Sequence, residues 1–320
     1  PGGGTYGMEA VARQFASGKS ALVIRNGFFS YRWSQIFAAG NIPSCEMVLK
    51  ARPVESGPNP AYAPAPIEEV TAAIAREKPA VVFAPHVETA AGIILPDAYL
   101  KAVAEATHAA GGLFVLDCIA SGTVWVDMQS LGIDVLISAP QKGWSSSPCA
   151  ALVMFSPRAE AALADSQSSS FAIDLKKWRQ IMQAYENGGH AYHATLPTDA
   201  LRQFHAAMRE AQGIGFDKLK QAQLELGRRA RAMIAGKGYK SLAAADFAAP
   251  GVVVSYTGDA EIHNSSKFTR NGFQTAAGVP LMCDEAADFR TFRIGLFGLD
   301  KLLNIDRTVD YLAEALDKVK

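Results

Sequence analysis

The chain has 320 residues, of which 49% are hydrophobic and 19% are charged, and its 31 Lys and Arg residues balance its 31 Asp and Glu residues. At about 150 residues per domain, this length predicts two domains with enough apolar material for a sizeable core. Zero net charge without a basic run excludes the electrostatic surface expected of a protein that binds nucleic acid or an anionic membrane. No apolar stretch approaches the length of a membrane span, about 18 residues.

The cysteines and the first residues of the chain give two further expectations. The four cysteines, at positions 45, 118, 149 and 283, form no CxxC pair. Such spacing favours free thiols in a reducing cytoplasm over a disulfide framework or a zinc site, and no metal site is predicted. The chain opens on Pro1-Gly2-Gly3-Gly4 without a Met or a preceding strand, so we expect an N-terminal segment to be missing.

Short apolar runs alternate with helix-like periods in the first half of the chain. This alternation predicts an α/β fold with a mostly parallel, doubly wound sheet between helices, each strand being covered on both faces. Helices are expected over Tyr6–Ala16 and from Pro96 to Ala110, and a Pro-rich loop over Pro53–Pro66. The expected strands are Ala21–Arg25, Met47–Lys50, Ala80–Ala84, Leu113–Asp117, Val135–Ser138 and Ala151–Phe155.

The second half of the chain has a different pattern. A long helical region is expected over Thr198–Ala235, with a break near Gly213–Gly215. Two strands, Val252–Tyr256 and Phe292–Phe297, and a closing helix, Leu303–Lys320, follow it. The sequence therefore predicts a large domain over residues 1–195 and, over residues 196–320, a linking helix with a smaller α+β domain.

A glycine-rich run, Gly2-Gly3-Gly4-Thr5-Tyr6-Gly7, opens the first predicted helix. Because free N–H groups and the helix dipole attract anions, Gly3, Gly4 and Thr5 are predicted to form a phosphate cradle. The run also fits G-x-G-x-x-G, which leaves a nicotinamide-dependent hydride-transfer enzyme as an alternative. That alternative needs an acidic residue after the next strand, where this sequence has Arg25-Asn26-Gly27.

Two ionisable side chains follow neighbouring predicted strands. Asp117 ends one strand and Lys142 comes shortly after the next, at the sheet edge where open α/β sheets bind ligands. Burial lowers the pKa of a lysine, and its neutral amine attacks carbonyl carbons. With the phosphate cradle, the pair predicts a pyridoxal phosphate site in which Lys142 forms an imine with the cofactor and Asp117 pairs with its pyridinium nitrogen.

These residues belong to a set of motifs that extends over nearly the whole chain and resembles the class V aminotransferases of fold type I, of the alanine–glyoxylate or serine–pyruvate type. The resemblance implies a sheet of the seven-stranded type in the large domain, and ping-pong transamination through a Schiff base on Lys142. Besides the residues from Gly2 to Glu9, the motifs are Pro85-His-Val-Glu-Thr89-Ala-Ala-Gly92, Leu116-Asp117-Cys-Ile-Ala-Ser121, Ser138-Ala-Pro-Gln141-Lys142, Tyr192-His-Ala-Thr195-Leu-Pro197 and Phe292-Arg293-Ile-Gly-Leu.

The resemblance also assigns residues to the cofactor. Phe29 falls where the family stacks an aromatic side chain, often Trp, on the pyridine ring, and Phe28 is the alternative at this position. Thr89 matches the residue whose hydroxyl bonds the phenolic oxygen of the cofactor. Gln141 matches a polar neighbour of the Schiff-base lysine.

Three further residues are assigned to the substrate and to a second subunit. Arg293 matches the arginine that binds the α-carboxylate of the substrate, a task that suits a bidentate guanidinium. Tyr192 and Thr195 match residues that reach the cofactor phosphate in the neighbouring subunit. The resemblance therefore implies a homodimer.

The implied reaction moves an amino group from a small L-amino acid, alanine or serine, to a 2-oxo acid, glyoxylate or pyruvate. One alternative is 2-aminoethylphosphonate–pyruvate transaminase, a near relative that shares most of the motifs. A cysteine desulfurase or lyase of the same superfamily is less well supported, because no cysteine lies in a recognisable flexible loop. A non-catalytic binding module is a further alternative, against which the joint presence of Lys142, Asp117 and Arg293 argues.

Overall fold

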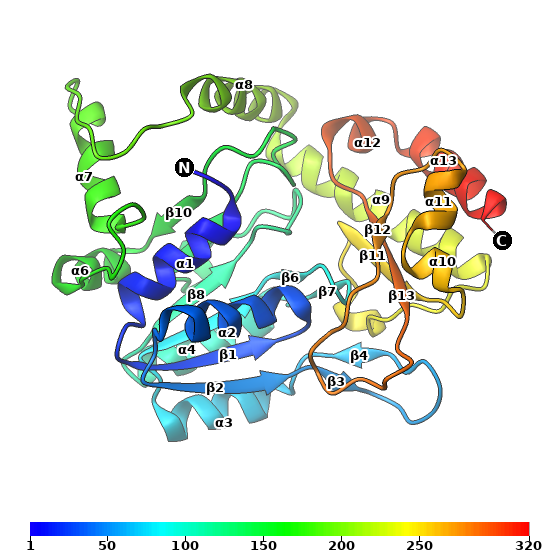
Figure 1. Ribbon diagram of the computed structural model, residues 1–320, viewed down its shortest axis with the longest axis horizontal. Helices are drawn as coiled ribbons and strands as arrows, with labels where there is room; N and C mark the ends of the chain where they lie inside the picture. The colour runs from blue at the N-terminus through cyan, green and yellow to red at the C-terminus, as the bar shows by residue number, and fades with distance from the viewer. Residues whose placement is uncertain (320) are drawn as a thin grey trace.

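The computed structural model describes residues 1–319, which fold around a six-stranded sheet in the order β10-β9-β8-β5-β1-β2 (Figure 1). All neighbouring strands pair in parallel except β9 and β10, which are antiparallel. The α/β class with a mostly parallel sheet is therefore confirmed, and within the described residues this sheet has six strands where the seven-stranded type was expected. The strands are β1 (Ser20–Arg25), β2 (Cys45–Lys50), β5 (Val81–Pro85), β8 (Leu113–Asp117), β9 (Val135–Ser138) and β10 (Leu152–Phe155).

The expectation that every strand is covered on both faces is correct only in the middle of the sheet. Strand β5 is buried along its whole length, and β1 and β8 are buried except at their first residue. Strands β2 and β10 lie at the two edges and remain partly exposed. Edge strands have no neighbour on one side, so their outer surface stays accessible although their sequences are as apolar as those of inner strands.

Helices cover both faces of the sheet. Helices α1 (Gly4–Phe15) and α2 (Phe28–Gly40) pack on one face, where the Trp33 ring lies 4.4 Å from the Phe83 ring of β5. Helices α3 (Ile67–Glu77) and α4 (Asp97–Ala109) pack on the other face through a separate apolar cluster. Because these central strands are parallel, their carboxyl ends all lie at one edge of the sheet.

Short elements interrupt the connections. The expected Pro-rich loop contains a two-residue pairing between β3 (Arg52–Pro53) and β4 (Tyr62–Ala63). A second short hairpin, β6 (Val87–Glu88) with β7 (Ile93–Ile94), follows strand β5 directly. Helix α5 (Met128–Leu131) is a single turn that Asp127 caps by accepting hydrogen bonds from two backbone N–H groups.

Residues after β10 form peripheral helices and a second sheet (Figure 1). Gly215, with φ of 101°, separates α8 from α9 within the predicted break. The closing helix begins at Ile305, and Lys320, its last expected residue, lies outside the described residues. The elements are α6 (Pro157–Asp165), α7 (Leu175–Glu186), α8 (Thr198–Ile214), α9 (Phe216–Gly236), η1 (Ala245–Phe247), β11 (Val252–Tyr256), α10 (Ala260–His263), α11 (Ser266–Arg270), β12 (Ala276–Ala277), β13 (Thr291–Gly295), α12 (Leu299–Leu303) and α13 (Ile305–Lys318).

The second sheet has its own core. Its strand order is β11-β13-β12, and α9 and α13 pack against it and against each other around Phe268 and Phe292. The division of the chain at residues 195 and 196 stays a prediction. No helix within residues 1–319 is both long and apolar enough to cross a membrane.

Candidate active site

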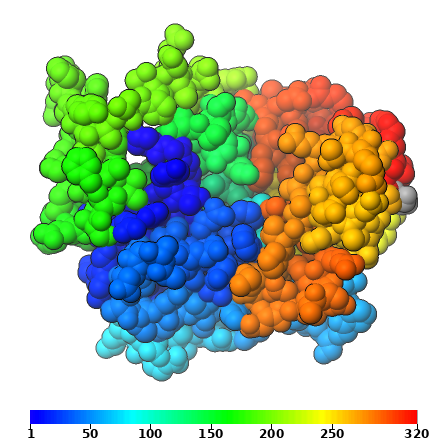
Figure 2. All heavy atoms as spheres, viewed as in Figure 1, coloured from blue at the N-terminus to red at the C-terminus, as the bar shows by residue number. Residues whose placement is uncertain are grey.

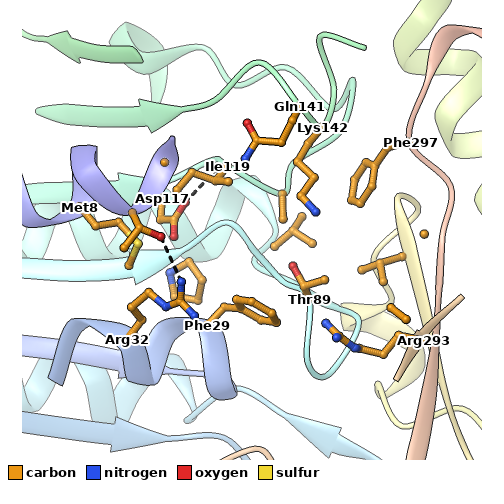
Figure 3. A pocket seen from close by; sticks show the side chains of 18 residues that line it. Met8, Phe29, Arg32, Thr89, Asp117, Ile119, Gln141, Lys142, Arg293 and Phe297 are labelled. Atoms are coloured by element: carbon orange, nitrogen blue, oxygen red, sulfur yellow. Dashed lines mark hydrogen bonds between the residues drawn. The ribbon is translucent and has the colours of Figure 1, made fainter. Parts of the chain in front are cut away.

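A cavity of about 380 Å³ lies where the carboxyl ends of β5, β8 and β9 face the second sheet (Figure 3). It brings together residues from the first turns of α1 and α2, from the loops after three central strands, and from β11 to β13. The lining residues are Gly4, Thr5, Met8, Phe29, Arg32, Pro85, Val87, Thr89, Asp117, Ile119, Ala120, Gln141, Lys142, Val252, Ala276, Arg293, Gly295 and Phe297. Two separately built parts of the chain therefore share one cavity.

Asp117 is the last residue of β8 and is only 8% exposed. One carboxylate oxygen accepts a hydrogen bond from the Ile119 N–H at 2.9 Å. Burial raises the pKa of Asp117 to about 7, the neighbouring Glu88 adds to this rise, and Arg32 opposes it. A buried carboxylate with a single hydrogen bond is costly to ionise, so this site favours a cationic ligand.

Lys142 follows β9 and extends into the cavity, between Thr89 and Phe297 (Figure 3). Its Nζ lies 5.5 Å from the centroid of the Phe297 ring. Burial lowers the pKa of Lys142, and the positive charge of Arg293 lowers it further. Both effects increase the fraction of neutral amine, which is the nucleophilic form.

Close backbone packing fixes the loop that carries Lys142. A Cβ atom on Gly143 would lie 1.9 Å from the carbonyl oxygen of Gly122, so only glycine fits here. Ser145 Oγ accepts a hydrogen bond from the Leu299 N–H at 2.7 Å, at the start of α12. The loop after β9 is thus held against both the loop after β8 and the C-terminal part of the chain.

The first turn of α1 forms the opposite end of the cavity. Gly3 is the N-cap, no side chain caps the helix, and its first turn holds no acidic residue. A Cβ on Gly4 would lie 2.3 Å from Ile119 Cδ1, and one on Gly3 would lie 3.9 Å from Gln141 Nε2. The buried Gln141 Oε1 has no hydrogen-bond partner. Free helix N–H groups suit a bound phosphate, and the Gln141 Nε2 group beside them is a further donor.

Helix α2 contributes an aromatic ring and a cation. The Phe29 ring lines the cavity, whereas Phe28 does not. Arg32, one turn further along the helix, lies with its Cζ 5.7 Å from the Phe29 ring centroid. The Arg32 guanidinium also donates a hydrogen bond to Thr5 Oγ1 at 3.0 Å (Figure 3). This bond ties the first turn of α1 to α2.

Arg293 reaches the cavity from β13 in the second sheet. Its Nε donates a hydrogen bond to the Ala277 carbonyl at 2.7 Å, and its Cζ lies 5.4 Å from the Phe29 ring centroid. The bond to Ala277 orients the guanidinium fork while its terminal nitrogens face the cavity. A fork in this orientation suits a planar carboxylate.

Comparison with known proteins identifies the family. The model of the aminotransferase class-V family matches residues 3–254, which is most of the chain. The chain belongs to the class V aminotransferases. Alanine–glyoxylate aminotransferase 1 of Saccharomyces cerevisiae is 28% identical over 233 residues, covering 68% of this chain and 56% of the relative. L-aspartate–glyoxylate aminotransferase of Paracoccus denitrificans is 26% identical over 242 residues, 75% of this chain and 58% of the relative.

The fold of this class V chain also matches solved structures. Alanine–glyoxylate aminotransferase from Nostoc sp. aligns with a TM-score of 0.81 at 21% identity, over 99% of this chain and 80% of that chain. Ureidoglycine–glyoxylate aminotransferase from Bacillus subtilis aligns with a TM-score of 0.79, also at 21% identity, over 99% and 78%. These similarities establish fold type I, and the chain spans little more than half the length of the first curated relatives.

Class V aminotransferases depend on pyridoxal phosphate, and the cavity fits that cofactor. The N–H groups at the α1 N-terminus suit its phosphate. The buried Asp117 suits its ring nitrogen, and Phe29 presents an aromatic face. Lys142 supplies an amine of lowered pKa for the aldehyde.

Most residues that the sequence analysis assigned to the site lie in or beside this cavity. Gly4, Thr5, Phe29, Thr89, Asp117, Gln141, Lys142 and Arg293 line it, and Gly3 lies at its rim as the N-cap of α1. Tyr192 and Thr195 do not line it: they lie between α7 and α8, where Tyr192 is 77% exposed. Within a single chain these two residues are separate from the site, and their assigned role stays a prediction.

Sequence reasoning missed several residues that form the site. Arg32 was detectable, because it lies one helical turn after Phe29 and off the apolar stripe of Trp33, Ile36 and Phe37. Phe297 lies at the end of an expected strand and Glu88 within a quoted motif, but nothing in the sequence indicated that Phe297 lines the cavity or that Glu88 lies beside it, because these positions depend on contacts between distant segments. No cysteine lines the cavity, and burial raises the pKa of Cys118 and Cys283.

Proposed function

We propose that this protein is a pyridoxal-phosphate-dependent transaminase that moves the amino group of a small L-amino acid, alanine or serine, to glyoxylate or pyruvate. The observation that carries the proposal is the convergence of Lys142, Asp117 and Arg293 on one cavity, from three separate elements. Relatives named for alanine–glyoxylate transamination support the substrate class. When bound, the cofactor supplies an aldehyde for the amino group and an electron-withdrawing ring for the resulting carbanion.

Each of the three residues then has a distinct task. Arg293 binds the α-carboxylate of the donor and so orients its α-hydrogen toward Lys142. The Lys142 amine acts first as a base and removes the proton from the α-carbon of the donor. It then acts as an acid and returns the proton to the carbon on the other side of the amino nitrogen. Ionised Asp117 keeps the ring nitrogen protonated, and the resulting ion pair returns the pKa of this carboxyl group toward its ordinary value.

The side chains beside Arg293 favour a small donor. Val252 and Ala276 line this part of the cavity, and the Phe297 ring closes the wall near Lys142. Besides Lys142, the cavity is lined by two cationic side chains, those of Arg32 and Arg293. Arg32 donates to Thr5 at the phosphate end, whereas the charge of Arg293 acts on Lys142, so Arg293 is the group placed to bind the substrate beside the amine.

A second candidate is 2-aminoethylphosphonate–pyruvate transaminase. The relative of that name from Burkholderia ambifaria is 27% identical over 325 residues, covering 99% of this chain. A guanidinium binds a phosphonate as well as a carboxylate, so Arg293 is compatible with both donors. A donor panel separates these two functions.

The proposed assembly is a homodimer in which Tyr192 and Thr195 reach the phosphate end of the partner's cavity. Large exposed apolar side chains support this proposal. Tyr6 on α1 (57% exposed), Phe171 before α7 (79%), and Met182 (60%) and Tyr185 (55%) on α7 are all accessible in the single chain. Contiguous exposed apolar groups mark association surfaces, and Figure 2 shows this segment projecting beside the N-terminal residues.

The decisive experiment is a visible absorbance titration of the purified protein loaded with pyridoxal phosphate. We expect an absorption band that bleaches with L-alanine and returns with glyoxylate. Borohydride treatment before alanine should fix the cofactor covalently on Lys142, as peptide mapping will show. Bleaching by 2-aminoethylphosphonate alone would favour the second candidate, and a band indifferent to all amines would contradict transamination.

A further inference from the structure

Glu88 is a fully buried carboxylate beside the cavity. Its side chain is 0% exposed, and no cation lies within 4.0 Å of it in the part of the chain that the structure describes. Its oxygens accept hydrogen bonds from the Phe29 N–H (3.2 Å), the Ser30 N–H (2.9 Å), Ser30 Oγ (2.6 Å) and the Ala90 N–H (2.9 Å). The mechanism proposed above does not use this group.

The Phe29, Ser30 and Ala90 N–H groups can only donate to Glu88, and the single Ser30 hydroxyl proton is shared between Glu88 and the Gly27 carbonyl. Burial raises the pKa of Glu88, and these hydrogen bonds oppose that rise because they favour the ionised carboxylate. Such a group only accepts hydrogen bonds and offers about four lone-pair sites. Three of the donors belong to the first turn of α2, where the helix dipole also favours negative charge. A glutamine of the same shape offers one accepting oxygen, and its NH₂ group would face N–H or O–H donors. The hydrogen-bond polarity of the site is therefore matched to glutamate and not to glutamine.

The carboxylate joins the two segments that hold the sides of the cavity. On one side, Phe29 and Ser30 begin α2, and the Phe29 ring faces the cavity. On the other, Glu88 itself precedes Thr89, which also lines the cavity. The contact is tight, because a Cβ on Gly27 would lie 2.8 Å from Glu88 Cγ. The spacing between the Phe29 ring and the Thr89 hydroxyl is thus set through one side chain.

We infer that Glu88 is a positioning residue that holds the Phe29 ring and the Thr89 hydroxyl at the spacing required by a cofactor ring between them. This inference rests on the cofactor site of the proposed function, but not on the identity of the amino donor. Glu88 touches neither substrate nor cofactor, and acts through the two residues that it connects.

The test is titration of the cofactor-free protein with pyridoxal phosphate, followed by absorbance and by the visible circular dichroism of the bound ring. We expect Glu88→Gln to weaken binding at least about tenfold and to reduce the dichroism of the bound cofactor. Ser30→Ala removes one of the four donors and should change both readouts in the same direction, but less. This milder variant keeps the test informative where Glu88→Gln folds poorly.

Asp134 provides a control at a buried carboxylate, 2% exposed, that lies away from the cavity. It accepts hydrogen bonds from the Phe114 N–H at 2.8 Å and Ser156 Oγ at 3.0 Å, and unlike Glu88 it also lies 2.8 Å from His108 Nε2 and 3.9 Å from Arg158 Nε. Asp134→Asn should lower the thermal midpoint without changing the affinity for the cofactor or its dichroism. A merely structural role for Glu88 would give its variants this same pattern.

The outcomes separate this inference from the proposed function. Wild-type affinity and dichroism in both Glu88→Gln and Ser30→Ala would overturn it, as would equal changes in Asp134→Asn. A wild-type protein that binds the cofactor but transaminates no donor would contradict the proposed function and leave this inference standing on the binding data. A wild-type protein that binds no cofactor would overturn both.

Discussion

The guanidinium carbon of Arg293 lies 5.4 Å from the centroid of the Phe29 ring, so the second sheet and the first turn of α2 meet at one point in the cavity. These residues are distant in the sequence, and Phe29 packs against an apolar cluster that includes Val252 and Val254 of the second sheet. The contact places the expected carboxylate-binding group beside the expected stacking surface. A donor held by Arg293 would therefore lie over the cofactor ring.

This relationship predicts that Arg293→Ala raises KM for L-alanine strongly, by about 10- to 100-fold, because a charge-assisted pair contributes roughly 1.5–3 kcal/mol. Arg293→Lys should restore little of the loss, since one ammonium cannot reproduce the fork that the Ala277 carbonyl orients. Steady-state kinetics with L-alanine measures both effects. An unchanged KM in Arg293→Ala would remove this residue from the substrate site.

Replacement of Lys142 is expected to abolish turnover. The same amine serves as covalent attachment point and as proton carrier, so Lys142→Ala should lose at least about three orders of magnitude in rate. Single-turnover absorbance with L-alanine measures the loss. Lys176→Ala is the control, because Lys176 donates only to the Ala164 carbonyl on an exposed surface. Substantial remaining activity in Lys142→Ala would contradict the assignment.

The raised pKa of Asp117 predicts a pH-dependent stability of the cofactor-free protein. Its pKa rises from 3.8 to about 7 through burial, so between these pH values the native chain keeps a proton that the unfolded chain has released. Stability therefore falls as the pH rises through this window. Asp117→Asn removes the titrating group and should gain stability relative to wild type, from nothing near pH 4 to on the order of 4 kcal/mol above pH 7, at about 1.4 kcal/mol per pKa unit.

Urea unfolding of cofactor-free wild type and Asp117→Asn between pH 4 and pH 8 measures this difference. Asp127→Asn is the control, because hydrogen bonds from the Ser130 backbone and side chain lower the pKa of that exposed carboxyl. Because this group titrates at or below its ordinary value of 3.8, the stability difference between Asp127→Asn and wild type should change little between pH 5 and pH 8. A constant difference between Asp117→Asn and wild type at all pH values would show that Asp117 does not titrate in this window. With the cofactor bound, Asp117→Asn and Asp117→Ala should instead cost orders of magnitude in turnover.

Gly143→Ala should destabilise the protein and displace Lys142. The added methyl group would lie 1.9 Å from the Gly122 carbonyl oxygen, so the loop must move, and overpacking of this kind costs about 1–3 kcal/mol. Gly258→Ala is the control, since nothing lies within 4 Å of a Cβ there. Thermal unfolding and the rate of the L-alanine half-reaction check the two effects. A wild-type thermal midpoint and a wild-type half-reaction rate in Gly143→Ala would show that the loop accommodates the methyl group without loss of stability or activity.

Subunit complementation tests the proposed dimer. A Lys142→Ala chain and a chain carrying Tyr192→Ala with Thr195→Ala should each be poorly active alone. When they are coexpressed, each mixed dimer would contain one complete site, which gives about a quarter of wild-type activity for random pairing. Activity that does not exceed the average of the two parents would show that Tyr192 and Thr195 do not act across the interface.

Many features of the fold and of the site were predictable because they depend on the local amino-acid sequence. A buried strand needs an apolar run, so β8 and β9 were found with correct limits, and with them the sheet edge at which Asp117 and Lys142 meet. The glycines at the start of α1 likewise indicated a helix N-terminus open to an anion. By itself, the sequence thus determined the α/β class, the resemblance to the family and most residues of the cavity.

Only the tertiary structure decided which distant segments meet. Strands β2 and β10 lie at the sheet edges although their apolar runs look like those of inner strands, because strand order depends on pairing and not on composition. The link from Glu88 to Phe29 and the approach of Arg293 to the same ring arise from long-range packing. The hydrophobic periodicity of a sequence indicates which residues are buried. It does not indicate which residues they pack against, because those contacts form only when distant segments of the chain pack together.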